Sequence, residues 1–418
     1  MRIKDLNKWI LDQKKKNLMK VSRINISDVI NWKIDNQKIF NYNKAFFSIV
    51  PFKFIKNNNE AWFQPLILQK EVGILGILKK KIKDVDYYLL QAKVEPGNKS
   101  GIQLSPTVQA TKSNYLQKHG GKKTNYLHFF IGNKLKIKTI SKSRLSEQGT
   151  RYLEKSNNNI LIDIRKEKIK KIKNYIWVTK ENLKYLLKKK NLLNMDTISV
   201  LSSSIKKNTL DNPINDFSNL KNTLTYLKKK IKIKKRIISF NDLKNWKIFK
   251  DKIVNNKNFF FSILFLKIKT SSREVSQWCQ PIVSDYHISL NGFLVKEINK
   301  TNHYLLQGVQ EAGLSSPKFT STISVKNFTK KIGNKDIKFL NLFKKKKIIK
   351  FINSDEGGRF FKNETHNLIK FLKEKEKVRL AKNFKWASHN QVIDLIKRNL
   401  LTIEARNLFA SFNIDKIH

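Results

Sequence analysis

A chain of 418 residues is long enough for two or three ordinary domains, and its 40% apolar residues can bury large cores, which excludes disorder throughout. Lysine and arginine total 86 against 32 acidic residues, and the formal charge of +54 points first to a polyanionic partner such as nucleic acid. Only 11 of the 86 basic residues are arginine, and Asn, Ile and Phe, which share AT-rich codons with lysine, are abundant, so coding bias is a simpler source of most of this charge.

The cysteine count and the hydropathy pattern indicate the compartment. Cys279 is the single cysteine, so no intramolecular disulfide can form, which suits a reducing compartment. The longest apolar run, Phe259–Leu266, is much shorter than the ~20 residues that a membrane span requires. Charged residues interrupt the first 20 positions every few residues. We expect a cytoplasmic protein without a membrane segment.

An internal repeat is the most informative feature of the chain. Residues 62–67 (WFQPLI) return as 278–283 (WCQPIV), and YLLQ occurs at 88–91 and again at 304–307, both 216 positions later. Further words recur at offsets of 214 (28–33 with 242–247) and 208 (146–152 with 354–360). The predicted organisation is an N-terminal helical extension (1–24), a first module expected to be catalytic (25–205), a linker (206–238) and a second module expected to be degenerate (239–418).

Strands and helices alternate within each predicted module. Short aromatic and aliphatic runs bounded by turn residues predict strands over Phe46–Phe54, Tyr87–Val94 and Thr107–Thr111, with a hairpin-like region at 73–76. Apolar residues at helical spacing follow Thr179 and Ser388, which have the character of helix caps. The predicted fold class is α/β (α+β), with two homologous modules that each contain a mixed sheet flanked by helices.

The strand that ends at Val94 carries the first candidate site. Alternation places Gln91, Lys93 and Glu95 on one face, which either lines a pocket or meets solvent. The second module keeps the glutamine and the glutamate but has Val309 in place of Lys93, and it lacks the Pro-Thr-Val-Gln run that contains Gln109. Chemistry that uses this run belongs to the first module, unless the strand has diverged only in its packing.

Two further motifs suit a nucleotide. Residues 146–151 (SEQGTR) combine small, hydroxyl and guanidinium groups that could hold a diphosphate, although a helix start followed by a salt bridge explains them as well. Trp62 and Trp278, each beside Gln and Pro, could stack on a base or pack in a core.

Several familiar catalytic motifs are absent from the sequence. No His-Glu-x-x-His pair, dinucleotide-binding Gly-x-Gly-x-x-Gly, Walker-type loop or Gly-x-Ser-x-Gly elbow is present. The chemistry is therefore expected to be acid–base work by side chains, without a metal or other cofactor.

Taken together, residues 62–65 (WFQP), 90–98 (LQAKVEPGN) and 103–115 (QLSPTVQATKSNY) resemble the nucleotide-sugar (NDP-hexose) 2,3-dehydratase family. The resemblance covers nearly the whole chain and includes the repeat. It implies two modules like the Nudix hydrolase fold, a homodimer, and a nucleoside-diphosphate 4-keto-6-deoxyhexose, usually linked to thymidine, as substrate. The Nudix signature helix itself is absent from both modules.

The resemblance also implies a reaction. A base removes the hydrogen on C3, which the C4 ketone acidifies, and the enolate expels the C2 hydroxyl as water to leave a 3,4-diketo-2,6-dideoxy sugar. The catalytic candidates are Glu95, His119, Lys93 and Tyr115. Substrate-binding candidates in the first module are Trp62, Gln64, Gln91, Thr107, Gln109, Ser146, Gln148, Gly149, Thr150, Arg151, Tyr152 and Thr179. Nucleotide-binding candidates in the second module are Trp278, Gln280, Gly357, Gly358 and Arg359.

Two alternatives remain at the level of the sequence. The charge and Lys-rich stretches such as 228–235 and 344–347 suit a non-catalytic protein that binds nucleic acid, although no recognition helix or stacking motif accompanies them, so no specific nucleic acid is expected and solvated faces are the simpler interpretation. A metal-dependent diphosphate hydrolase of Nudix type would need a carboxylate cluster at helical spacing, which neither module has.

Overall fold

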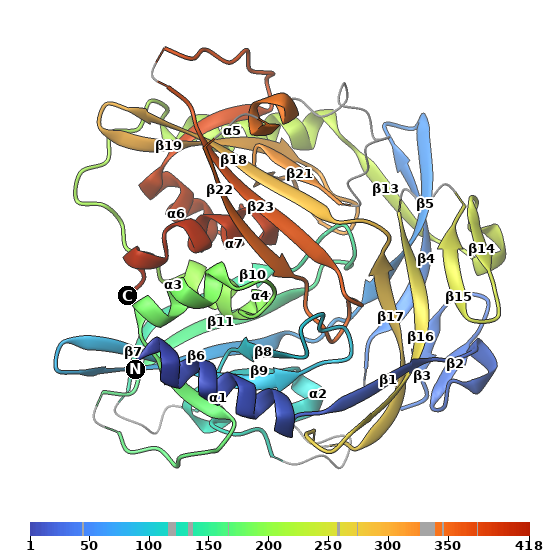
Figure 1. The fold of residues 1–418 in the computed structure, drawn as a ribbon. Coiled ribbons are helices and arrows are strands. Elements are labelled where there is room, and N and C mark those ends of the chain that lie inside the picture. Colours follow the sequence, from blue (N-terminus) through green and yellow to red (C-terminus); the bar gives the residue numbers. More distant parts are fainter. Residues whose placement is uncertain are drawn as a thin grey trace.

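The structure is a computed structural model that describes residues 1–43, 46–115, 123–132, 137–165, 167–256, 260–273, 275–326, 339–344, 347–373 and 375–418. Strands dominate it, and the same order of elements occurs twice along the chain (Figure 1). The first half contains α1 (Ile3–Lys16), β1 (Met19–Arg23), β2 (Trp32–Ile34), β3 (Ile39–Asn41), β4 (Ser48–Lys56), β5 (Glu60–Leu68), β6 (Gly73–Ile82), β7 (Val85–Val94), β8 (Ile102–Ser105), β9 (Val108–Ala110), α2 (Lys112–Tyr115), β10 (Lys138–Ser146), β11 (Ser156–Asp163), β12 (Tyr175–Val178), α3 (Lys180–Lys188) and α4 (Met195–Ser202). The second half contains α5 (Phe217–Lys230), β13 (Ile233–Ile237), β14 (Trp246–Ile248), β15 (Lys252–Asn255), β16 (Phe261–Thr270), β17 (Gln277–Asp285), β18 (Ser289–Ile298), β19 (Thr301–Val309), β20 (Lys318–Thr320), β21 (Ile323–Val325), β22 (Ile348–Ser354), β23 (Glu364–Phe371), β24 (Phe384–Ser388), α6 (His389–Lys397) and α7 (Ile403–Phe412).

Each half builds one large mixed sheet. The first has the order β10-β11-β6-β7-β12, with β8 beside β7 and β9 beside β6. The second repeats these pairings with β22-β23-β18-β19, where β20 and β24 lie beside β19 and β21 lies beside β18. Among the described strands, neighbours run antiparallel except for the pairs β6/β11 and β18/β23. The expected mixed α+β fold is confirmed.

Two smaller sheets exchange a strand between the halves. Strand β1 of the first half pairs with β16 of the second, and β13 of the second half pairs with β4 of the first (Figure 1). The unit α1–β1 and the unit α5–β13 have matching boundaries 214 residues apart, for example 217 − 3 = 214.

This exchange revises the two segments that the sequence analysis expected to be an extension (1–24) and a linker (206–238). Both contain the same helix–strand unit, and each strand completes a sheet of the opposite half. Lysine residues interrupt the apolar alternation of both strands, which leave much of their surface exposed, so a strand pattern did not stand out there.

The halves share one core. Helices α4 and α7 pack against each other, α4 lies on β6 and β11, and α7 lies on β18 and β23, so helices fill the space between the two large sheets (Figure 1). One continuous cluster of buried apolar side chains includes Tyr88 and Leu193 from the first half and Tyr304 and Phe409 from the second. Each sheet therefore hides its apolar face only when both halves are present.

The two expected helix starts are confirmed. Thr179 caps α3, and its hydroxyl accepts a hydrogen bond from the backbone N–H of Asn182, whose side chain bonds back to the cap. Ser388 caps α6 through the same reciprocal pair of bonds with Gln391. Such boxes satisfy two N–H groups that a helix leaves unpaired at its start.

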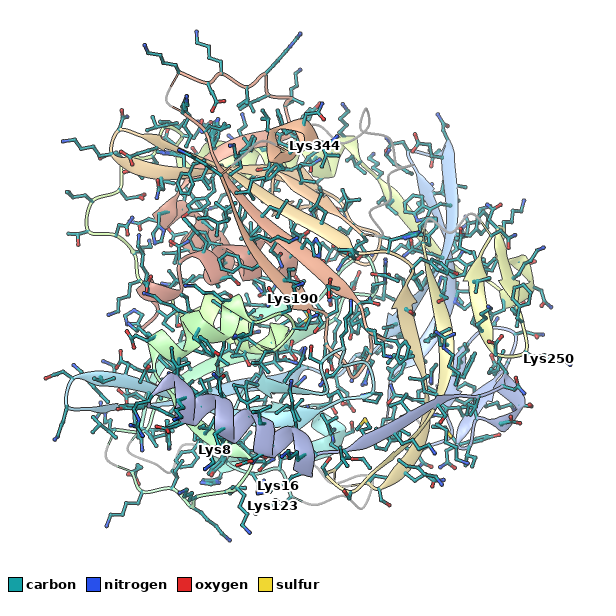
Figure 2. All side chains as sticks on the ribbon, in the orientation of Figure 1. Lys8, Lys16, Lys123, Lys190, Lys250 and Lys344 are labelled. Atoms are coloured by element: carbon teal, nitrogen blue, oxygen red, sulfur yellow. The ribbon has the colours of Figure 1, made fainter. Side chains whose placement is uncertain are left out.

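Lysine side chains lie around the outside of the molecule, as the labelled Lys16, Lys123 and Lys250 show in Figure 2, and all three are exposed. The run at Lys228–Lys230, at the end of α5, is exposed as well. These residues form solvated faces. None of the helices in the described ranges is both long enough and apolar enough to cross a membrane.

Candidate functional site

A cavity of about 430 Å³ lies where the two halves meet. Strands β7 and β9 form its wall on the first half, and β17 and the loop 356–359 form its wall on the second half. It brings together many residues that the sequence analysis singled out. These are Gln91, Lys93, Glu95, Thr107, Gln109, Tyr152, Trp278, Gln280, Gly358 and Arg359.

The remaining candidates do not line this cavity. Trp62 stacks on Phe54 with ring centroids 5.0 Å apart, and Thr179 is the helix cap described above. The others outside it are Gln64, Ser146, Gln148, Gly149, Thr150, Arg151 and Gly357. His119 and the side chain of Tyr115 lie outside the described part of the chain.

A reciprocal exchange of loops explains why most candidates of the loop 146–151 do not line the cavity, although Glu147 of this loop does. The N–H of Gly97 donates to the carbonyl of Gly357 at 2.8 Å, and the N–H of Gly313 donates to the carbonyl of Gly149 at 2.6 Å. The loop after β10 and the loop after β22 therefore each pack against the other half. Nucleotide binding by Trp278, Gln280 and the loop 357–359 stays a prediction, and Trp278, Gln280, Gly358 and Arg359 line the same cavity as Glu95.

Lys93 is the centre of a polar network in the cavity. Its Nζ lies 2.9 Å from Oε1 of Glu95 and donates to Oε1 of Gln109 at 2.7 Å. Gln109 in turn donates from Nε2 to Oδ2 of Asp196 at 2.7 Å. Lys93, near the end of β7, and Glu95, which directly follows that strand, are in contact as alternation predicts, and β9 presents Gln109 beside Lys93.

The carboxyl of Glu95 is held in its ionised form. Burial alone would raise its pKa, but the nearby cations Lys93 and Arg273 outweigh burial and hold the pKa below its ordinary value. The side chain of Glu95 is 5% exposed, so this charge is shielded from bulk water. A shielded carboxylate that opens onto a cavity can accept a proton from a bound molecule.

Other carboxyls of the same cavity are shifted in the opposite direction. Burial, reinforced by Glu356 and Glu147, raises the pKa of Asp196 well above its ordinary range. Burial also raises the pKa of Glu356, which accepts a hydrogen bond from the hydroxyl of Tyr152 at 3.3 Å. The cavity thus combines a carboxyl whose pKa is lowered with carboxyls whose pKa is raised, and opposite shifts of this kind are the usual arrangement of a base and an acid.

Sequence reasoning missed Asp196 and Glu356. Asp196 lies in the first turn of α4, next to the cap Asn194, where an acidic residue is explained by the helix dipole alone. Glu356 belongs to the second half, so no sequence pattern of the first half includes it. The sequence feature that could have indicated Glu356 was the repeat between residues 146–152 and residues 354–360.

Trp278 and Gln280 position the loop 356–359. The indole Nε1 of Trp278 donates to Oε1 of Gln280 at 2.8 Å, and Nε2 of Gln280 donates to the carbonyl of Gly358 at 2.8 Å. In the first half the equivalent Gln64 donates to the carbonyl of Thr150 at 3.2 Å. Both glutamines therefore fix a loop, while the face of Trp278 remains on the cavity wall.

Thr107 has a structural function that the sequence did not reveal. It is fully buried, and its hydroxyl donates to the carbonyl of Leu89 and accepts from the N–H of Leu78 at 3.0 Å. Thr322 makes the same pair of contacts in the second half. The second module thus keeps this threonine, while the position of Gln109 changes to Ser324.

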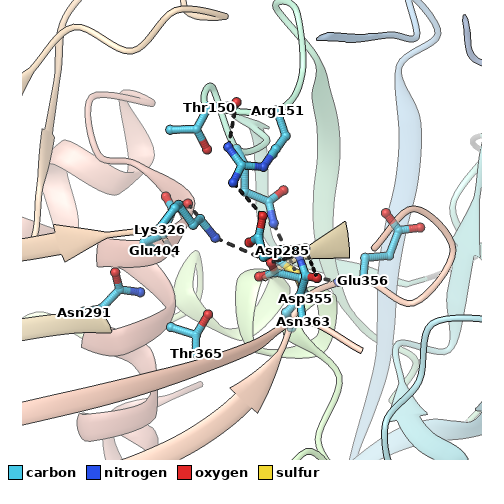
Figure 3. Close-up of polar contacts among 12 residues, drawn as sticks. Thr150, Arg151, Asp285, Asn291, Lys326, Asp355, Glu356, Asn363, Thr365 and Glu404 are labelled. Atoms are coloured by element: carbon cyan, nitrogen blue, oxygen red, sulfur yellow. Dashed lines mark hydrogen bonds and ion pairs between the residues drawn. The ribbon is translucent and has the colours of Figure 1, made fainter. Parts of the chain in front are cut away.

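The equivalent site of the second half is almost closed. A hollow of about 30 Å³ remains there, and Lys326 lies between Asp355 at 3.5 Å and Glu404 at 3.6 Å (Figure 3). Burial, with Glu404 nearby, raises the pKa of Glu311, the counterpart of Glu95, to about 8. Without a lysine at position 309, this glutamate has no adjacent cation on its own strand. In the described ranges no group of three or more His, Cys, Asp or Glu side chains is arranged to hold a metal ion.

A mixed sheet that presents a base and several acids to one cavity is typical of an enzyme that moves protons. Comparison with known proteins identifies its family. The sequence model of NDP-hexose 2,3-dehydratase matches residues 3–203 and 218–412. The chain belongs to the NDP-hexose 2,3-dehydratase family, which are hydro-lyases acting on nucleotide sugars.

Three characterised relatives are similar to almost the whole chain. Each is named dTDP-4-dehydro-6-deoxy-alpha-D-glucopyranose 2,3-dehydratase. The protein of Amycolatopsis orientalis is 28% identical over 99% of this chain and 90% of its own length. Those of Saccharopolyspora spinosa and Streptomyces violaceoruber are both 29% identical, over 97% and 98% of this chain and 90% and 97% of their own lengths.

One solved structure, described as an ADP compounds hydrolase, is similar to part of the chain. It has 15% identity and a TM-score of 0.25 over 37% of this chain and 84% of that chain. At this score the similarity carries no argument about the chemistry.

Proposed function

We propose that the chain removes water across C2 and C3 of a dTDP-linked 4-keto-6-deoxyglucose and yields the 3,4-diketo-2,6-dideoxy sugar. The printed names of the three relatives support this choice of substrate. The cavity in which Glu95 and Asp196 have opposite pKa shifts is the observation that carries it. We also propose, from the resemblance, a cytoplasmic homodimer with Nudix-like halves that arose by internal duplication.

In this proposal Glu95 is the base. Its carboxylate takes the hydrogen from C3 of the sugar, and the electron pair of that C–H bond forms the enolate with the C4 ketone. The ammonium group of Lys93, which lies 2.9 Å from Glu95, stabilises the developing negative charge. The pair acts as a unit because a buried carboxylate keeps its charge only beside a cation.

Asp196 or Glu356 is the acid. Burial raises the pKa of each, which favours the protonated form, and a protonated carboxyl at either position can protonate the C2 hydroxyl as the enolate expels it as water. Gln109 orients Asp196, and Tyr152 donates to Glu356. The enol that results from the elimination tautomerises to the C3 ketone, so the step needs no oxidant or reductant.

The test is incubation of the purified protein with dTDP-4-keto-6-deoxyglucose, in the presence of a chelator and without added nicotinamide. We expect a product that has lost one water and still carries its nucleotide. Release of a nucleoside monophosphate would indicate a hydrolase, and unchanged substrate would contradict the proposal.

Glu311→Gln is a matched control for Glu95→Gln, because the two glutamates are 216 residues apart and follow the equivalent strands β7 and β19. We expect Glu95→Gln to lower kcat by about 100-fold or more, as general-base catalysis contributes 10²–10⁴-fold. Glu311→Gln should leave kcat within about twofold of the unmodified chain. Equal losses in both variants would show that the glutamate supports the fold and not the chemistry.

A further inference from the structure

Two arginines occupy equivalent places in the halves and have similar surroundings. Arg151 and Arg359 are 208 residues apart, and Nη1 of each donates to the carbonyl of the preceding residue, at 3.1 Å and 2.9 Å. Each guanidinium lies over a phenylalanine ring, Arg151 over Phe261 at 4.4 Å and Arg359 over Phe47 at 4.1 Å. A ring face at this distance holds a guanidinium plane in place and leaves its N–H edge free to bind.

Their electrostatic partners differ. Arg151 donates from Nη2 to Oδ1 of Asp285 at 2.6 Å, in an ion pair whose side chains are 5% and 2% exposed (Figure 3). The residue equivalent to Asp285 is Gln69, because 285 − 216 = 69, the offset that relates the two Trp-x-Gln-Pro words. An amide thus stands in the first half where the second half has a carboxylate.

Arg359 therefore keeps its charge available. Among the residues that the structure describes, no carboxylate lies within 4.0 Å of its guanidinium, whereas its buried Nε lacks a hydrogen-bond partner just as that of Arg151 does. The charge of Arg359 lowers the pKa of Glu356 and of Glu95, but neither of these two carboxyls forms an ion pair with it within 4.0 Å. Gln69 and Arg359 both line the main cavity.

We propose that Arg359 binds the diphosphate of the nucleotide sugar, and that Gln69 determines this by leaving the guanidinium without an internal carboxylate. A guanidinium presents two parallel N–H groups that match two phosphate oxygens, and the diphosphate is the strongly anionic part of the substrate. The equivalent site of the second half has its arginine neutralised by Asp285, so it lacks a free cation for such a group. This inference rests on the proposed function. In it, the second half supplies the residue that binds the diphosphate, Arg359, and the first half supplies the base, Glu95.

The test places a carboxylate at position 69. In Gln69→Asp the new side chain should pair with Arg359 as Asp285 pairs with Arg151. Binding of thymidine diphosphate, measured by isothermal titration calorimetry, should become roughly 10- to 100-fold weaker, since the loss of hydrogen bonds to a charged group changes a dissociation constant by about this factor. Binding of thymidine, which lacks the diphosphate, should change less than twofold.

Arg359→Gln provides a second route to the same result, should a carboxylate at position 69 prevent folding, and thermal unfolding identifies a misfolded variant. The control is Asp285→Asn in the other half, which should bind thymidine diphosphate like the unmodified chain. If Gln69→Asp or Arg359→Gln is folded and binds thymidine diphosphate with unchanged affinity, the inference is wrong.

A kinetic measurement separates this inference from the proposed function. With dTDP-4-keto-6-deoxyglucose, Arg359→Gln should raise KM at least tenfold and lower kcat less than threefold, because the diphosphate is remote from the breaking bonds. A chain that binds thymidine diphosphate through Arg359 but does not dehydrate the sugar refutes the proposed reaction alone. A chain that dehydrates the sugar without needing Arg359 refutes the inference alone.

Discussion

Replacement of Lys93 by methionine tests the physical basis of the site most directly. Methionine keeps most of the volume of the side chain but removes the charge that lies 2.9 Å from Glu95. The second half has Val309 at the equivalent position, so the strand itself tolerates an apolar residue there. The loss of stability should therefore come from Glu95, which would remain buried without the cation in contact with it, and Arg273, 4.0 Å away, would be its nearest remaining ion-pair partner.

The size of this loss follows from the proton equilibrium of Glu95. A buried carboxylate without a partner can take up a proton, and protonating a group of ordinary pKa 4.5 costs about 1.4 kcal/mol for each pH unit above that value. The cost is therefore limited to roughly 3 kcal/mol at pH 7 and to under about 1 kcal/mol at pH 5. In the unmodified chain the pKa of Glu95 is lowered, so its stabilising effect is present above pH 4.5 and is lost as the pH falls through the lower value.

The assay is denaturant unfolding of four proteins at both pH values: the unmodified chain, Lys93→Met, Glu95→Gln and the double variant. Lys93→Met should lose roughly 3 kcal/mol at pH 7 and much less at pH 5, and the double variant should recover most of the loss. The same variant should lose dehydratase activity at neutral pH, because a protonated Glu95 cannot act as a base. An equal loss at both pH values would refute the reasoning, since it would show that packing and not charge is responsible.

Three other outcomes follow from the structure. The pKa of Glu311 is raised to about 8, so its protonated form stabilises the fold below pH 4.5, and this contribution is lost as the pH rises to 8. Relative to the unmodified chain, the unfolding free energy of Glu311→Gln should therefore increase across this range, by at most ~1.4 kcal/mol per pH unit. A Cβ on Gly97 or on Gly313 would lie 1.7 Å from a carbonyl oxygen of the other half, so Gly97→Ala and Gly313→Ala should lower the melting temperature to a similar extent, and a neutral effect of either would contradict the loop exchange. Thr107→Val removes a buried hydroxyl with two backbone partners and should cost about 1–3 kcal/mol in unfolding free energy with KM nearly unchanged, whereas a large rise in KM would restore this residue to the substrate site.

The sequence by itself determined the features that depend on local pattern. Period-two alternation identified β7 and the shared face of Lys93 and Glu95, and the hydroxyl residues Thr179 and Ser388 were recognised as helix caps. These predictions succeed because a strand places alternate side chains on one face and a helix start needs a hydrogen-bond acceptor, whatever the rest of the chain does. The repeated words also predicted two similar modules from spacing alone.

Only the tertiary structure decided which residues share the site. The two halves exchange β1 with β13, and the loops 146–152 and 354–360 each pack against the other half. The residues around Glu95 therefore come from both halves of the chain. Sequence reasoning assigned Arg151 to the first site and Arg359 to the second, because it assumed that each module completes its own cavity. Proximity across an exchanged interface has no periodic signature, since it depends on which surfaces become buried together when the two large sheets cover their apolar faces with one shared set of helices.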